Sequence, residues 1–114
     1  MNQISNVILL YEPDAALRAD FANSLAAAGW TVEVAATWDE LLQLKPVSPP
    51  RLVVVGLGAE TSSPDLAPLV AQHSRAQMIV LAVAPGKELL LEWFHVGVRD
   101  VLPRPVDADV LVAV

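Results

Sequence analysis

The stretch RLVVVGLG, residues 51–58, decides the fold of this chain. Its four consecutive apolar residues predict a strand that is buried on both faces, and such a strand lies inside a sheet rather than at its edge. In open parallel sheets, ligands bind beyond the carboxyl ends of the strands. Gly56 ends the apolar run, so a residue without a side chain stands where a functional group would be expected.

Similar runs recur on both sides of this strand. Apolar or alternating segments predict further strands at residues 7–11, 31–35, 77–83 and 99–102. The segments between them predict helices at residues 13–28, 38–44, 65–73 and 87–96, and a last helix that begins near Ala108 and is cut off at Val114. Strands that alternate with helices predict an α/β fold, a doubly wound parallel sheet with helices on both faces.

Local signals set the expected helix ends. Pro13 suits the first position of the first helix, and Gly29 suits its C-terminal cap. Thr37 and Glu40 have the spacing of a capping box, in which each side chain accepts a hydrogen bond from the other residue's backbone. Pro68 disfavours the early part of the third helix, which we therefore expect to be short and to begin near Ala67.

Composition limits the function. At 114 residues the chain fits one domain, and its net charge of -6 opposes binding to nucleic acid or anionic lipid. The absence of cysteine excludes disulfides and thiolate metal sites. No run approaches the roughly 20 apolar residues of a membrane span, and the N-terminus lacks a signal-peptide pattern, so we expect a cytoplasmic domain. His73 and His95 fall at expected helix ends and are interpreted as surface residues rather than metal ligands.

Nearly the whole chain resembles the receiver (CheY-like) domain of the response regulators in bacterial two-component signal transduction. VILLYEPDAALR (7–18) stands where that family has its first strand, an acidic cluster and its first helix. RLVVVGLG stands at the strand that bears the phosphoacceptor aspartate, and HVGVRDVLPRPVD (95–107) is similar to the closing stretch with its Lys-Pro pair. The resemblance implies a flavodoxin-like sheet of five parallel strands in the order 2-1-3-4-5.

The chemistry of the family does not carry over to this sequence. The positions that match its phosphorylation site are Glu12, Pro13, Asp14, Gly56, Ala82, Arg104 and Pro105. Gly56 replaces the aspartate, Ala82 replaces the hydroxyl residue that reads the phosphate, and Pro13 interrupts the acidic cluster. Phosphoryl transfer to a carboxylate requires that nucleophile and a metal ion held by further acids. The sequence therefore predicts a non-enzymatic pseudo-receiver with no phosphorylation, metal or cofactor.

Arg104 replaces the family's lysine, and the resemblance implies that the bond to Pro105 is cis. Because Gly56 leaves space beside two acids, we expect the guanidinium to pair with Glu12 or Asp14 and to act as a fixed strut. The alternative is that Arg104 points into solvent.

The helix at residues 87–96 has an unusually wide apolar arc, formed by Leu89, Leu90, Trp93 and Phe94. Part of this arc should be exposed, because one inner face cannot cover all of it. We expect this helix and the fifth strand to bind a protein partner or a second copy of the chain. Trp93 itself fits either the core or an interface anchor.

Three functions remain open. The first is a regulatory or assembly module, similar to the N-terminal domains of pilus-assembly and localisation ATPases of the tight-adherence type, with an effector domain beyond this chain. The second is the input domain of an atypical transcriptional response regulator in a phosphorelay. A GxxxxGK[ST] motif beyond Val114 would support the first, and a helix-turn-helix the second. The third is a flavodoxin-like ligand binder or enzyme, disfavoured because EPDAAL (12–17) lacks a hydroxyl-rich phosphate cradle.

Overall fold

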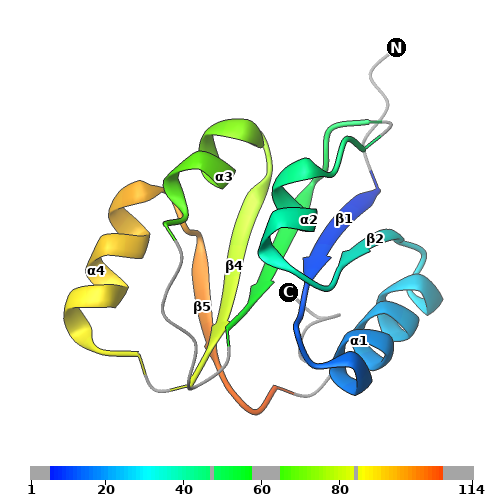
Figure 1. The fold of residues 1–114 in the computed structure, drawn as a ribbon, viewed down its shortest axis with the longest axis horizontal. Helices are drawn as coiled ribbons and strands as arrows, with labels where there is room; N and C mark the ends of the chain where they lie inside the picture. The colour runs from blue at the N-terminus through cyan, green and yellow to red at the C-terminus, as the bar shows by residue number, and fades with distance from the viewer. Residues whose placement is uncertain (1–5, 47, 58–64, 84, 107–114) are drawn as a thin grey trace.

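The structure is a computed structural model that describes residues 6–46, 48–57, 65–83 and 85–106. Five strands form one sheet, and helices cover both of its faces (Figure 1). The strands are β1 (Val7–Tyr11), β2 (Thr31–Ala35), β3 (Leu52–Gly56), β4 (Gln77–Ala82) and β5 (Asp100–Pro103). The helices are α1 (Ala15–Ala27), α2 (Trp38–Gln43), α3 (Ala67–Gln72) and α4 (Lys87–Val96).

The strand order is β2-β1-β3-β4-β5, and every neighbouring pair is parallel, as the sequence predicted. β3 lies at the centre, where Val54 pairs with Leu10 of β1 on one side and Ile79 of β4 on the other. Because all strands are parallel, their carboxyl ends lie along the same side of the sheet, which we call its carboxyl edge. Gly56 closes β3 at that edge.

The core consists of two apolar layers, one on each face of the sheet. Successive side chains of a strand point to opposite faces. Val53 and Val55 of β3 accordingly join the layer under α2, α3 and α4, while Val54 joins the layer under α1. Phe21 and Leu25 anchor α1 to its layer, with about 1% of each exposed.

The N-terminal end of α1 differs from the expectation. Pro13 precedes the helix instead of occupying its first position, because Asp14 is the N-cap. The Asp14 carboxylate accepts hydrogen bonds from the backbone N–H groups of Ala16 and Leu17, at 2.9 and 3.1 Å. Such a cap satisfies two of the backbone N–H groups that the first turn of a helix leaves unpaired. At the other end, Gly29 adopts φ of 100° immediately after the cap, the left-handed conformation that favours glycine.

The capping box of α2 is shifted by one residue. The Thr37 hydroxyl accepts from the Glu40 N–H at 3.1 Å, as predicted. The Glu40 carboxylate, however, accepts from the N–H of Ala36 at 2.8 Å. α3 begins at Ala67 with Pro68 in its first turn, and both its late start and its short length confirm the prediction.

The predicted last helix, from Ala108 to Val114, lies outside the described residues. Within the described part of the chain, no helix is long and apolar enough to cross a membrane.

Candidate functional site

Gly56 lies at the carboxyl end of the central strand, in a space that neighbouring side chains already fill. A Cβ atom added to Gly56 would lie 2.5 Å from Glu12 Oε1 and 2.9 Å from Arg104 Nη1. Carbon atoms do not approach such atoms so closely in packed interiors. The position that matches the family's aspartate is therefore not an empty site, because the side chains of Glu12 and Arg104 occupy it.

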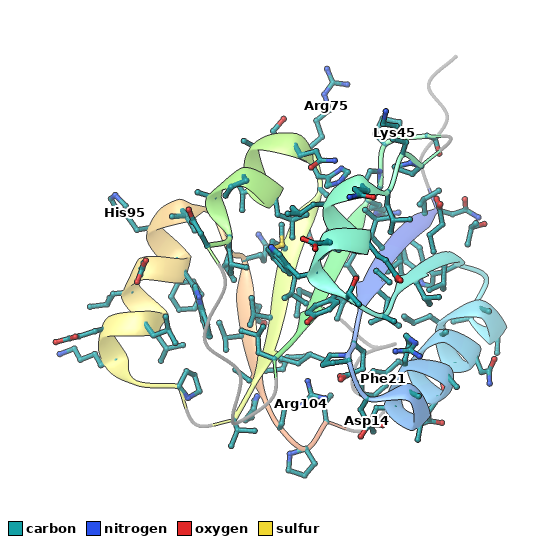
Figure 2. All side chains as sticks on the ribbon, in the orientation of Figure 1. Asp14, Phe21, Lys45, Arg75, His95 and Arg104 are labelled. Atoms are coloured by element: carbon teal, nitrogen blue, oxygen red, sulfur yellow. The ribbon has the colours of Figure 1, made fainter. Side chains whose placement is uncertain are left out.

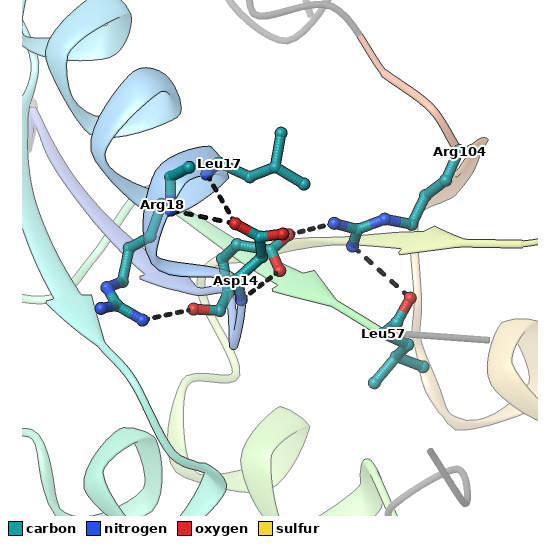
Figure 3. Close-up of polar contacts among 7 residues, drawn as sticks. Asp14, Leu17, Arg18, Leu57 and Arg104 are labelled. Atoms are coloured by element: carbon teal, nitrogen blue, oxygen red, sulfur yellow. Dashed lines mark hydrogen bonds and ion pairs between the residues drawn. The ribbon is translucent and has the colours of Figure 1, made fainter. Parts of the chain in front are cut away.

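Glu12 follows β1 directly and is 1% exposed, the one charged residue that is fully buried in the described part of the chain. Its Oε1 atom accepts a hydrogen bond from Arg104 Nη2, and its Oε2 atom accepts from the Asp14 N–H at 3.0 Å (Figure 3). Its backbone carbonyl accepts from the Arg18 guanidinium at 2.9 Å. Buried carboxylates are tolerated when they are paired and hydrogen-bonded in this way.

Arg104 extends from the end of β5 across the edge of the sheet to Glu12 (Figure 3). Its backbone N–H donates to the carbonyl of Ala82 at 3.0 Å, which ties it to the end of β4. Its Nη1 atom also lies 3.5 Å from the carbonyl of Leu57, and 11% of the side chain is exposed. The predicted ion pair is present, with Glu12 as the partner, and the Arg104-Pro105 bond is cis as expected.

The remaining positions of the site either cap a helix or have no oxygen in the side chain. The Asp14 carboxylate caps α1, and Pro13 lies exposed in the turn before it. Ala82 is 4% exposed and brings only a methyl group. Pro105 is exposed at the rim.

Magnesium, the metal that the family resemblance implies, does not fit this set of residues. Mg²⁺ takes oxygen ligands, with carboxylates supplied by the protein. Here Glu12 is already paired with a guanidinium, and Gly56 has no side chain to contribute a ligand. Among the described residues, no group of three or more His, Asp or Glu side chains is placed to hold a metal ion.

Two residues at this site were missed by the sequence analysis. Arg18 lies in the first turn of α1 and donates a hydrogen bond to the Glu12 carbonyl. Tyr11, the last residue of β1, is 8% exposed and packs edge-on against Trp38 with ring centroids 5.6 Å apart. Burial raises the pKa of the Tyr11 phenol, and the negative charge of Glu12 raises this pKa further. In the sequence, only the closeness of Tyr11 and Arg18 to Glu12 along the chain could have indicated that they belong to this site.

The proposed interaction face on α4 requires a correction. Trp93 is 3% exposed and belongs to the core, so it is not an interface anchor. Leu89 and Leu90 are half-buried against the same core layer. Phe94 is 46% exposed as expected, and Leu91, which the prediction omitted, is 60% exposed. The apolar arc is in fact two surfaces, because residues 89, 90 and 93 face the sheet whereas residues 91 and 94 face outward.

Comparisons with known proteins agree with this architecture. No protein-family model and no curated protein matches the sequence. Solved structures do match: a response regulator from Burkholderia pseudomallei, with a phosphorylated aspartic acid and a calcium ion, superimposes with a TM-score of 0.81 at 21% identity. The receiver domain protein from Methanospirillum hungatei gives 0.82 at 20%, and Vibrio cholerae CheY4 gives 0.80 at 18%. The chain has the receiver-domain fold.

Coverage differs among these structures. The matches cover 94% to 96% of this chain. This chain spans 64% of the Burkholderia protein, 90% of the Methanospirillum protein and 95% of CheY4. It spans 50% of a further match, the Thermotoga maritima response regulator DrrB, at 17% identity and a TM-score of 0.77. At these identities the likeness concerns the receiver fold, and function must be argued from the residues of the site.

Proposed function

We propose that this chain is a non-phosphorylatable pseudo-receiver, a regulatory protein-interaction module in signalling or in the localisation of pilus assembly. One observation carries the proposal: the Glu12–Arg104 ion pair fills the space beside Gly56 where the receiver fold would place its reactive aspartate. Without a carboxylate at residue 56 there is no nucleophile for a phosphoryl group. The similarity of VGVRDVLPRPVD (96–107) to the N-terminal domains of pilus-assembly ATPases supports the second setting.

The ion pair supports a fixed scaffold rather than a switch. It connects the end of β1 to the segment after β5, across the full width of β3 and β4. A two-state switch needs a ligand with different affinity for the two conformations. In a receiver, phosphate would supply that difference in affinity. Here the side chains of Arg104 and Glu12 occupy the space that the phosphate would need. Signals would then pass through protein contacts alone.

The first test is phosphorylation itself. We expect acetyl phosphate or beryllofluoride with Mg²⁺ to leave the intact mass and the tryptophan fluorescence of this chain unchanged. A receiver domain that has its aspartate, treated in parallel, serves as the positive control. A mass increase of one phosphoryl group that is released by hydroxylamine would identify an acyl phosphate and would contradict the proposal.

The second test concerns the outer surface of α4. Leu91 and Phe94 are the exposed large apolar residues of this helix, and exposed apolar patches commonly mark protein contacts. We expect the chain to self-associate or to bind its partner through them, so sedimentation velocity should show the association weakened by Phe94→Glu and Leu91→Glu. Val34→Glu is the matched control, because Val34 is 45% exposed on β2, at the opposite edge of the sheet from β5. Equal effects of all three changes would reject α4 as the contact surface.

A further inference from the structure

A hollow of about 340 Å³ lies at the amino-terminal end of the strands, opposite the Glu12–Arg104 pair. One wall is the connection from α2 to β3 and contains Pro46, Pro49 and Pro50. The other wall is the turn from α3 to β4, residues 72–76. The volume is at the lower end of the range of ligand sites, about 300 to 1,000 Å³, so it suits a few side chains rather than a large cofactor.

The hollow is held open by the structure around it. The Gln72 side-chain amide donates to the carbonyl of Leu42 at 3.1 Å, which joins the ends of α3 and α2. The turn after α3 is fixed by hydrogen bonds from His73 N–H to the Leu69 carbonyl and from Ala76 N–H to the His73 carbonyl, at 3.1 and 3.0 Å. The φ angle of each proline is fixed by its ring. A site that is rigid before binding loses little entropy when it is occupied.

His73 carries an unused hydrogen-bonding group in this wall. The sequence predicts a surface histidine here, but the side chain is half-buried, and its Nε2 atom is buried with no hydrogen-bond partner among the described residues. Burial also lowers the pKa of the imidazole. A buried polar atom without a partner is rare in proteins and costs stability. A neutral imidazole offers an N–H or a lone pair, and a peptide bond can satisfy either one once the ring turns toward the hollow.

Positive charge is concentrated at the same end of the molecule. Four of the seven lysine and arginine residues immediately precede strands or lie in the connections before them: Lys45, Arg51, Arg75 and Arg99. Figure 2 shows Lys45 and Arg75 at this end, with Asp14 and Arg104 at the other. Among the described acidic residues, only Asp100 begins a strand or lies in a connection here. This end is therefore basic although the chain has a net charge of -6.

The extent of the basic surface favours a chain over a small ion. Its residues precede β3, β4 and β5, which are adjacent strands. With strands about 4.8 Å apart, the cations extend over roughly 10 Å, the length of about three residues of an extended peptide. Arg51 is positioned by the ring of Trp30, whose centroid lies 5.6 Å from the guanidinium carbon. One small anion could not contact all of these groups.

We propose that the hollow and its surrounding cations form a docking site for an acidic peptide segment of a partner protein. Acidic side chains would pair with Arg75, which lines the hollow, and with the cations beyond it. The peptide backbone would lie against the proline wall and bond to His73 Nε2 after the imidazole turns toward the hollow. This site is separate from the outer face of α4, so neither depends on the other.

Fluorescence anisotropy with a fluorescein-labelled oligoglutamate peptide tests the proposal at low salt. The net charge of the chain repels such a peptide, so binding requires a local basic site. We expect Arg75→Ala to weaken binding by about fivefold, the upper end for an exposed ion pair, and His73→Ala to weaken it as well. Lys87→Ala is the control, because it removes the same charge from an exposed residue at the opposite end and should change binding less than about twofold.

Each other outcome would overturn the proposal. Failure of oligoglutamate to bind, or an equal loss in the Arg75 and Lys87 variants, would show that no specific basic site exists. Displacement of the peptide by succinate at the same carboxylate concentration would assign the hollow to a small anion instead. Arg75 is exposed, so its variant should fold, and the result does not depend on the half-buried His73.

Discussion

Removal of the Arg104 side chain tests whether the ion pair at the end of the sheet holds the fold together. In Arg104→Ala, the Glu12 carboxylate would keep the hydrogen bond from the Asp14 N–H but would lose its cation. Glu12 is 1% exposed, so its negative charge would remain buried without a positively charged partner. A buried charge without a partner is much more costly than an exposed one.

The expected loss follows from this burial. Breaking a buried ion pair by deleting one partner costs about 3 to 5 kcal/mol. Arg104 is 11% exposed, and its deletion would let water reach Glu12, so we expect the lower end, about 3 kcal/mol at pH 7. Domains of this size unfold with about 5 to 15 kcal/mol in total. At about 4 °C per kcal/mol, the melting temperature should fall by roughly 12 °C.

Urea unfolding followed by tryptophan fluorescence measures this loss, since the chain contains three tryptophans. Lys87→Ala removes the same charge from an exposed site and should change the unfolding free energy by less than about 0.5 kcal/mol. In a double-mutant cycle with Glu12→Gln, the two losses should not add, because the residues contact each other. A loss of no more than about 1 kcal/mol for Arg104→Ala, or additive losses in the cycle, would refute the strut.

Two further predictions concern packing and pH. Gly56→Ala should lower the unfolding free energy by about 1 to 3 kcal/mol through overpacking, whereas Gly86→Ala, where an added Cβ meets nothing within 4 Å, should cost less; equal losses in denaturant titrations would contradict the close contact at Gly56. Because burial lowers the pKa of His73 in the folded state, the unfolded chain binds this proton more readily, and stability should decline as pH falls below about 6.5. His73→Gln should reduce this decline relative to wild type and to a His95→Gln control, and an unchanged pH profile of melting temperature would disprove the effect of burial.

Much of the fold can be predicted from local patterns in the sequence. The apolar run at residues 52–55 predicted a central strand, and the structure places it between β1 and β4. Pro68 correctly predicted a late, short α3. The pairing of Arg104 with an acid was one of two alternatives that the sequence left open, and the structure shows that the pair forms beside Gly56.

The choice among neighbouring groups depended on tertiary packing. The sequence allowed Arg104 to pair with either Glu12 or Asp14. In the structure it pairs with Glu12, because the Asp14 carboxylate caps α1. Trp93 and Phe94 are adjacent in the sequence, yet one is buried and the other exposed, because only one of them faces the sheet. The hollow beside His73 joins two connections 20 or more residues apart, so no local pattern could indicate it. Sequence by itself determined which segments form strands and helices, since hydrophobic periodicity and caps act over a few residues. Partners across the fold were decided only by the tertiary structure, because burial and ion pairing depend on distances in space.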